Sequence, residues 1–205
     1  FRRVLFRSSK GEGLGNKFLA NIREVDAIIQ VIRCFEDANI LREEGPINPV
    51  GDKEIIETEL QLKDLESVEK KISRTEKNAK AGGDKDAAKC LEALKVFKQH
   101  LEQGKPARSA PVAEEDFRFV SDIFLLTAKP VLYVCNVDEG SVVSGNKYVD
   151  QLKEAVKDEK SEVLVIAAAI EAEISQLESF EDRQAFLSDL GLSESGVSLL
   201  IKAAY

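Results

Sequence analysis

One short stretch of the sequence carries residue types suited to binding a small ligand. A run of β-branched and aromatic residues, Val131 to Cys135, ends at Asn136, and the acid Glu139 comes three residues later. An asparagine amide offers a hydrogen-bond donor and an acceptor in one plane, whereas a carboxylate offers acceptors only. Together these two groups could read the edge of a nucleotide base. The same pattern is typical of a polar turn with an asparagine cap, and taken alone it favours that turn.

The apolar run before Asn136 predicts a strand. Its apolar residues occupy consecutive positions, which is typical of a strand buried on both faces of a parallel sheet. Two further runs, Asp26 to Phe35 and Val163 to Ile166, have the same character. Ligands of open α/β sheets bind at the carboxyl ends of the strands. We therefore expect Asn136 to lie at the ligand-binding edge of a mostly parallel sheet.

Between the first two strands the apolar residues recur at helical spacing. The first such segment runs from about Lys53 to Lys80, and the second follows a spacing of four and three that is typical of a coiled-coil seam. Gly82-Gly83 separates them, and Gly104 and Pro106 end the second. The sequence thus predicts an antiparallel helical hairpin. Its expected seam positions are Ile56, Leu60, Leu65, Val68 and Ile72, then Ala87, Leu91, Leu94, Lys98 and Leu101, of which Lys98 is the one polar position.

The remaining apolar patterns predict shorter helices around the sheet. Ser193 is expected to cap the last of them, because serine is a preferred residue before the first helical turn. The expected segments are Lys17 to Arg23, a helical turn within Ala113 to Ser121, and then Tyr148 to Val156, Ile170 to Leu177, Asp182 to Asp189 and Gly196 to Tyr205.

Composition excludes several classes of function. The 205 residues suffice for one sizeable core with an inserted subdomain, and no apolar run reaches the length of a membrane span. No secretory signal is evident near the first residue. The three cysteines have no metal-ligand spacing, and the single histidine, His100, argues against a zinc site or a Ser-His-Asp triad. These features favour a reducing, cytoplasmic setting.

The charge is unevenly distributed along the chain. Residues 114–205 hold 18 acids and 8 bases, a net charge of −10, whereas residues 1–113 carry +2. An acidic surface repels phosphate groups, so this half is poorly suited to nucleic acid. We expect no sequence-specific binding of DNA.

A glycine-containing loop near the first residues superficially resembles a phosphate-binding loop. Gly11, Gly13 and Gly15 stand at alternate positions. The motif G-x-x-x-x-G-K-[ST] needs a hydroxyl residue after its lysine, but Phe18 follows Lys17. No other stretch of the chain supplies the motif, and residues 1–8 have no interpretable pattern.

The segments, taken in order, resemble the YchF-type Obg-like ATPases, a branch of the translation-factor GTPase class. The similarity extends from about Ser9 to Tyr205. Asn136 to Glu139 is similar to the N-x-x-E base-reading motif of that family. The other segments that carry the resemblance are Ser9 to Leu19, Asp26 to Glu36, Asn48 to Val50, Thr58 to Leu65, Gly82 to Lys85 and Ala168 to Ile174.

The resemblance implies a definite organisation. The fold would be α/β, with a mostly parallel and incomplete sheet of the P-loop NTPase type and an inserted antiparallel coiled-coil hairpin. Residues 9–52 and 107–205 would form part of a G-domain, residues 53–106 the helical insertion, and residues 1–8 an unmatched segment. The family's phosphate-binding loop, magnesium ligands and D-x-x-G motif would precede Ser9, and a TGS domain would follow Tyr205. We therefore expect the central fragment of a longer protein.

The resemblance also implies a function for that parent protein: binding and hydrolysis of ATP, and more weakly of GTP, with Mg²⁺ and in association with ribosomes. Asn136 would brace the site and contact the base, the backbone of Val137 would meet adenine, and Glu139 would replace the aspartate of the GTPase motif N-K-x-D. The backbone of Ala167 and Ala168 would close the other side of the base. No catalytic or metal-binding residue is expected in this chain, so the fragment alone is expected to be inactive. The alternatives are a helical-hairpin binding module for ribosome or protein partners, and a fragment without any activity.

Overall fold

The computed structural model describes residues 14–40, 45–81 and 85–204, and these form an α/β protein. The chain divides into two compact units. The first, the helical unit, comprises Phe1–Ile28 and Glu54–Pro130, and the second, the sheet unit, comprises Ile29–Lys53 and Val131–Tyr205. The α/β class expected from the sequence is confirmed, whereas the domain boundaries proposed above stay a prediction.

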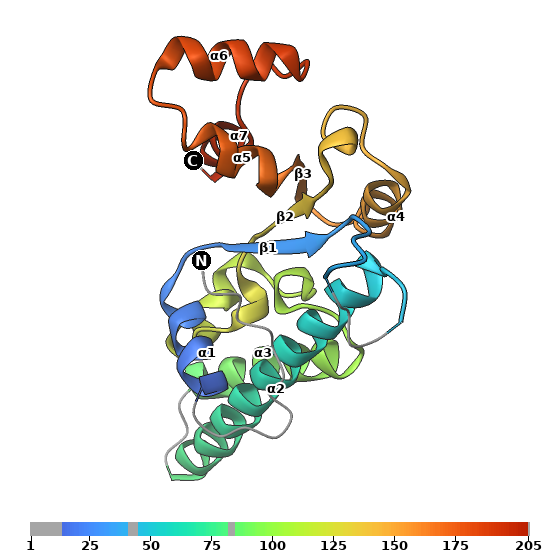
Figure 1. Ribbon diagram of the computed structural model, residues 1–205. Helices are drawn as coiled ribbons and strands as arrows, with labels where there is room; N and C mark the ends of the chain where they lie inside the picture. The colour runs from blue at the N-terminus through green and yellow to red at the C-terminus, as the bar shows by residue number, and fades with distance from the viewer. Residues whose placement is uncertain (1–13, 41–44, 82–84, 205) are drawn as a thin grey trace. The chain divides into compact units, whose positions relative to one another are not determined.

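Three described strands form one sheet in the order β1-β2-β3. Their bounds agree with the predicted apolar runs: β1 is Ile28–Arg33, β2 is Val131–Asn136 and β3 is Glu162–Ile166 (Figure 1). Strands β2 and β3 are parallel, with Asn136 opposite Ile166.

Strand β1 runs alongside β2 in the same direction. At one end the N–H of Ile28 donates to the carbonyl of Pro130 at 3.0 Å, and at the other the N–H of Cys34 donates to the carbonyl of Asn136 at 2.8 Å. The carboxyl ends of the strands therefore meet at one edge of the sheet, as the apolar runs predicted. The prediction that this strand is buried on both faces is wrong, because Ile29 and Val31 of β1 are exposed, at 46% and 63%.

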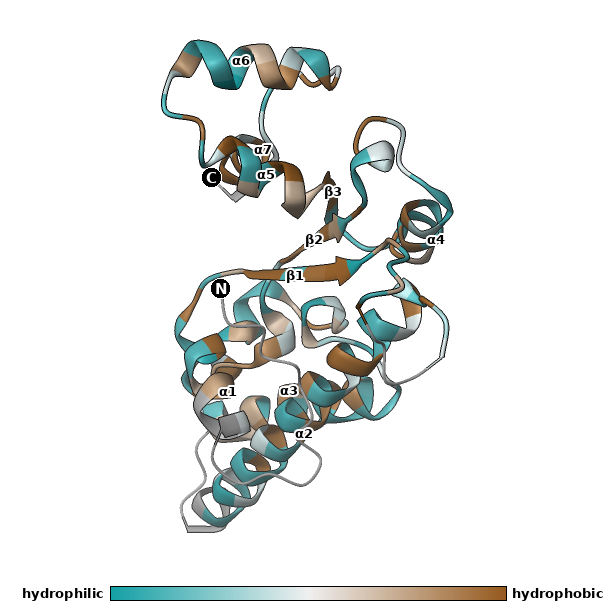
Figure 2. Ribbon diagram, viewed as in Figure 1, coloured by the Kyte–Doolittle hydropathy of each residue, from teal (hydrophilic) through white to brown (hydrophobic). Residues whose placement is uncertain are grey.

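The core of the sheet unit is formed by β2 and helix α4, Lys147–Ala155. Tyr133, Val149 and Leu152 are almost completely buried in it, and each such side chain contributes about 1.5–3 kcal/mol through burial. Asn146 fixes the start of α4, because its side chain accepts hydrogen bonds from the N–H groups of Tyr148 and Val149. Figure 2 shows the hydrophobic colour running along β1, whereas brown and teal alternate along α4 and α6.

Three further helices complete the sheet unit: α5 (Ala168–Ile174), α6 (Phe180–Asp189) and α7 (Gly196–Ala204). The predicted cap at Ser193 is wrong. Ser195 directly precedes α7, and its hydroxyl accepts a hydrogen bond from the N–H of Ser198 at 3.1 Å. Ser193 lies two residues too early to reach the first turn.

All three cysteines are buried free thiols. Cys135 in β2 and Cys34, just after β1, are both 0% exposed. Contact with the Cys135 thiol, together with burial, raises the pKa of Cys34. Both side chains therefore act as small apolar residues, as their positions in the sequence predicted.

Among the described residues, the helical unit contains two whole α-helices and most of a third. Helix α1 is Leu14–Glu24, α2 is Pro49–Ala81 and α3 is Lys85–Glu102, followed by three 3₁₀ segments, η1 (Ala107–Ser109), η2 (Glu114–Ile123) and η3 (Leu126–Ala128). The two long helices predicted from the apolar spacing are thus confirmed, but the predicted turn at Gly82-Gly83 lies outside the described residues. Although α2 has 33 residues, neither it nor any other described helix is long and apolar enough to cross a membrane.

The buried face of α3 differs from the predicted seam. Leu94 and Leu101 are buried as expected, but Leu91 is only half-buried. Phe97 is 0% exposed and packs edge-on against Phe117 of η2 at 5.3 Å between ring centroids. Helix α3 packs against both α2 and the η segments, so its apolar stripe is wider than the two positions of a coiled coil. The structure does not confirm a coiled coil here.

A buried carboxylate joins α2 to η3. Asp64 is 0% exposed, and its two oxygens accept hydrogen bonds from the N–H of Leu126 (2.7 Å), the N–H of Thr127 (2.7 Å) and the Thr127 hydroxyl (2.6 Å). Burial raises the pKa of Asp64, while the hydrogen bonds from Thr127 and Leu126 act in the opposite direction. We call this arrangement the Asp64 latch.

Candidate functional site

The predicted site residues lie in two loops at the carboxyl edge of the sheet. Asn136 is the last residue of β2, and Val137 follows it. Ala167 and Ala168 follow β3, with Ala168 opening α5. Because Asn136 and Ile166 are register partners, the two loops leave the sheet side by side. The structure therefore brings four of the five predicted positions together.

Two hydrogen bonds join these loops. The side-chain oxygen of Asn136 accepts from the N–H of Ala168 at 3.0 Å, and the N–H of Val137 donates to the carbonyl of Ile166 at 2.9 Å. The amide oxygen of Asn136 is thus already bonded to the neighbouring loop. Its amide NH₂ group donates to no other described residue and remains available to a ligand.

Val137 contributes only backbone to the site. Its side chain is 3% exposed and belongs to the hydrophobic core. Its N–H is already bonded to Ile166, and no described residue donates to its carbonyl oxygen. The free polar group of Val137 is therefore an acceptor.

Glu139 lies apart from these contacts. It opens the short 3₁₀ segment η4, Glu139–Ser141, and it is exposed. Its neighbour Asp138 accepts hydrogen bonds from the Ser141 hydroxyl at 2.9 and 3.0 Å. No hydrogen bond or ion pair joins the Glu139 side chain to another described residue. The structure thus leaves its carboxylate free, without placing it against Asn136 or Ala168.

Two residues beside the site were missed from the sequence. Glu171 of α5 accepts hydrogen bonds from the N–H groups of Gly196 (2.6 Å) and Val197 (3.2 Å) at the start of α7. Gly196 is buried against Ile166, where β3 ends. An acid in one short helix and a glycine opening another are weak signals in a sequence, because only the tertiary packing brings them together.

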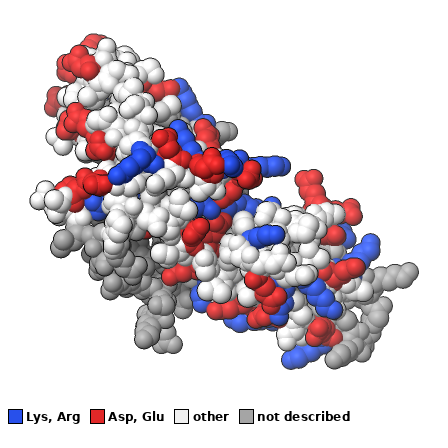
Figure 3. Space-filling model, turned by 90° about the vertical axis from the view of Figure 1, so that its right-hand side faces the viewer, with Lys and Arg blue, Asp and Glu red and all other residues white. Residues whose placement is uncertain are grey.

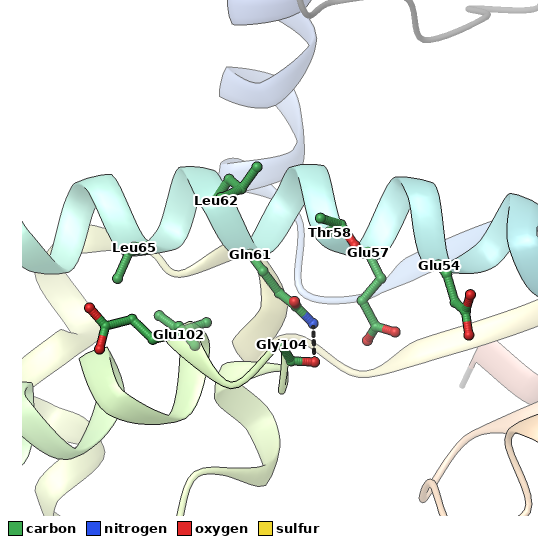
Figure 4. Close-up of a pocket in the computed structure, with 9 residues that line it drawn as sticks. Glu54, Glu57, Thr58, Gln61, Leu62, Leu65, Glu102 and Gly104 are labelled. Carbon is green, nitrogen blue, oxygen red and sulfur yellow. Dashed lines mark hydrogen bonds between the residues drawn. The ribbon is translucent and has the colours of Figure 1, made fainter.

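The helical unit has a shallow pocket of about 380 Å³ along α2. Its lining combines leucines with carboxylates, among them Leu65, Glu54 and Glu102, and the amide of Gln61 donates to the carbonyl of Gly104 at 3.3 Å (Figure 4). Glu57, also in the lining, is paired with Arg108 at 2.8 Å. None of the predicted site residues lines this pocket.

The described residues supply no metal site. Within residues 14–40, 45–81 and 85–204, no three histidine, cysteine, aspartate or glutamate side chains gather as ligands for an ion. Gly11 and Gly13 of the glycine-containing loop lie outside the described residues. At the carboxyl edge of the sheet, the described polar groups without a partner are the amide NH₂ of Asn136, the carbonyl oxygen of Val137 and the carboxylate of Glu139.

The chain was compared with protein-family models, with curated proteins and with solved structures. No family model matches the chain. It is 50% identical over 200 residues to the Ribosome-binding ATPase YchF of Bacillus subtilis (strain 168), and 43% identical over 198 residues to the protein of the same name in Escherichia coli O157:H7; each match covers 97% of this chain and 54% of the relative.

A solved structure, the Schizosaccharomyces pombe YchF GTPase, matches with a TM-score of 0.84 and 30% identity, again over 97% of this chain and 54% of that one. The chain spans about half the length of the curated relatives that it matches. The sequence comparison, with 50% identity over 200 residues, and the structural comparison indicate the same group of proteins. The chain therefore resembles the YchF proteins over 97% of its own length and over about half of theirs.

Proposed function

We propose that this chain is the base-reading part of a longer nucleotide-binding protein, the full-length parent, which binds and hydrolyses ATP and, more weakly, GTP. The observation that carries the proposal is the hydrogen bond from the Ala168 N–H to Asn136 Oδ1. It ties two loops at the carboxyl edge of a parallel sheet, where nucleotides bind in open α/β folds. The names of the relatives, one an ATPase and another a GTPase, support a nucleoside triphosphate as the ligand.

The free polar groups suit adenine. The exocyclic amine of adenine is a donor, and the carbonyl of Val137 is an acceptor with no partner among the described residues. The NH₂ group of Asn136 can donate to a ring nitrogen. The backbone of Ala167 and Ala168 would close the other side of the base, and Ala167 offers no hydroxyl where a serine is usual in the family. Glu139 supplies a carboxylate at the fourth position of the motif.

The partners and the setting belong to the same proposal. The ribosome is the proposed partner because the curated relatives are named ribosome-binding, and the cytoplasm is the proposed setting. On the face drawn in Figure 3, acidic side chains gather at the upper left, and acidic and basic side chains are mixed over the rest. Such a face suits a specific protein or ribosome contact better than generic binding of nucleic acid. Mg²⁺ would neutralise the phosphates in the parent, with ligands outside the described residues.

The second candidate is a binding module that acts without catalysis through an antiparallel hairpin of α2 and α3. It is favoured by the apolar residues that α2 exposes, Ile55 at 54% and Leu62 at 55%. The two candidates make opposite predictions about Asn136, because a module of this kind would not need a base-binding residue.

Replacing Asn136 with alanine in the full-length parent is expected to weaken ATP binding about tenfold. The change removes the amide donor and releases the Ala168 N–H, a loss of about 1.4 kcal/mol or more. Titration with a fluorescent ATP analogue measures the effect. Asn39→Ala, at an exposed asparagine of the same unit, is the matched control and should bind as the unchanged protein does. Equal affinity of Asn136→Ala and the parent would remove the basis of the proposal.

The 205-residue chain alone is expected not to hydrolyse ATP. Phosphoryl transfer depends on groups that position the phosphates and neutralise their charge, and neither a phosphate-binding motif nor a metal site is found in the described residues. Release of inorganic phosphate by the purified chain, beside the full-length parent as positive control, tests this. A rate that scales with the chain concentration and disappears in Glu139→Ala would show the prediction to be wrong.

A further inference from the structure

We propose that Glu171, by holding the start of α7 against the end of β3, positions the Ala167–Ala168 backbone and thereby sets how tightly the site holds an adenine base. Glu171 is a positioning residue in this proposal and touches no ligand. The inference rests on the proposed function, since it concerns the same base-binding site.

The side chain of Glu171 clamps α7. Its Oε1 accepts from the N–H of Gly196 at 2.6 Å, and its Oε2 accepts from the N–H of Val197 at 3.2 Å. The first N–H groups of a helix have no partner within the helix, and a carboxylate there is stabilised by both the hydrogen bonds and the helix dipole. One side chain thus satisfies two donors, 25 and 26 residues away in the sequence.

The backbone of the same residue reaches the base-side loop. The N–H of Glu171 donates to the carbonyl of Ala167 at 3.1 Å, which closes the first turn of α5. Ala168, one residue on from Ala167, is the residue whose N–H is bonded to Asn136. A movement of Glu171 is therefore transmitted directly to the two residues proposed to face the base.

Gly196 makes the close approach possible. A Cβ atom at this position would lie 2.7 and 2.9 Å from the side-chain carbons of Ile166 and 3.0 Å from the Glu171 Oε1. Ile166 is the last residue of β3, and Glu171 is the acceptor that binds the start of α7. Any residue larger than glycine would therefore displace one of these two side chains. Glycine is required here by space.

The Ile166–Ala168 turn is consequently held from two sides. Asn136 and Val137 hold it from β2 through bonds of 3.0 and 2.9 Å. Glu171 of α5 and Gly196 of α7 hold it from the other side. A binding site that is fixed on both sides before the ligand arrives loses less conformational freedom on binding.

The first test uses the 205-residue chain and needs no ligand. Hydrogen exchange of the Ala168 amide, followed by NMR, reports whether the loop stays bonded to Asn136. Glu171→Gln keeps the shape but loses one acceptor and the charge, and it should raise the exchange rate about threefold to tenfold. Gly196→Ala should act in the same direction. Glu173→Gln, on the exposed side of the same helix, is the matched control and should leave the rate unchanged.

The second test uses the full-length parent and separates the base from the phosphates. Glu171→Gln should raise the dissociation constant for ATP about threefold to tenfold, whereas binding of inorganic tripolyphosphate, which carries no base, should not change. A purely structural role for Glu171 would weaken both ligands alike, so that result would overturn the inference.

The outcomes distinguish the inference from the function it rests on. Unchanged exchange at Ala168 in both variants, or unchanged ATP affinity in Glu171→Gln, overturns the inference and leaves the proposed function standing. If Asn136→Ala keeps the ATP affinity of the parent, the base does not bind at this edge, and the proposed function fails together with the inference.

Discussion

Replacing Asp64 with alanine is expected to lower the free energy of unfolding of the helical unit by about 3–5 kcal/mol. The Asp64 latch places two backbone N–H groups and one hydroxyl on a single carboxylate that is 0% exposed. Alanine would leave these three donors buried without an acceptor. Removing one partner of a buried network costs more than the network's net contribution, because the remaining groups stay desolvated.

A second variant shows whether geometry or acceptor number matters. Asp64→Asn keeps the shape but exchanges one acceptor oxygen for an NH₂ group, so it should cost less than alanine, about 1–3 kcal/mol. Urea unfolding followed by circular dichroism measures both variants. Glu66→Ala is the matched control on α2: Glu66 is exposed and, among the described residues, pairs with Lys63 at 3.1 Å, which is worth less than about 1 kcal/mol. A loss below about 1 kcal/mol for Asp64→Ala would show that the latch does not stabilise the fold.

In the full-length parent, Glu139→Asp is expected to shift the preference between ATP and GTP toward GTP by about tenfold to hundredfold. Guanine presents an N1–H and an exocyclic amine, two donors that a correctly placed aspartate grips with both oxygens. Adenine presents an acceptor at N1, which would face the same carboxylate with repulsion. The additional methylene of Glu139 moves the carboxylate outward and removes that discrimination.

The test leaves Val137 unchanged. A lysine there would restore the GTPase motif more fully, but Val137 is 3% exposed in the core, so a buried ammonium group would destabilise the site and obscure the result. Competition of ATP against GTP gives the ratio of dissociation constants directly. Glu181→Asp, the same change at an exposed position of α6, is the control. If the parent already prefers GTP, or if Glu139→Asp leaves the ratio unmoved, the choice of base is not made at residue 139.

The sequence predicted those features that depend on neighbouring residues. The run Val131 to Cys135 is buried on both faces, so its apolar pattern is continuous and its strand was identifiable. The family resemblance, and not the strand pattern, assigned Asn136 and Ala168 to one site, and the hydrogen bond between them is a finding of the structure. In α2 two of the predicted apolar positions, Leu60 and Val68, are buried and the other three are half-buried, since one face of a helix repeats every three to four residues.

Features that depend on distant contacts were not predictable in this way. In the sequence, Asp64 resembles any other acid on a charged helix. It becomes a buried acceptor only because Leu126, 62 residues further along the chain, packs against it. The seam of α3 was misjudged because the spacing of Leu91 and Leu94 carries no information about the η segments that cover Phe97. Lys53, predicted only as a helix start, is 7% exposed and pairs with Glu159 at 2.6 Å.

The exposed face of β1 bears on how this chain behaves in solution. Ile29 and Val31 expose branched apolar side chains on β1, one of the two outer strands among the three that are described. An outer strand with apolar side chains is a template on which a strand from another molecule can add. Concentrated samples of the chain will therefore tend to self-associate through this strand. A lysine in place of Val31, the kind of residue that sheets use to discourage such pairing, offers a practical way to keep the chain monodisperse for spectroscopy.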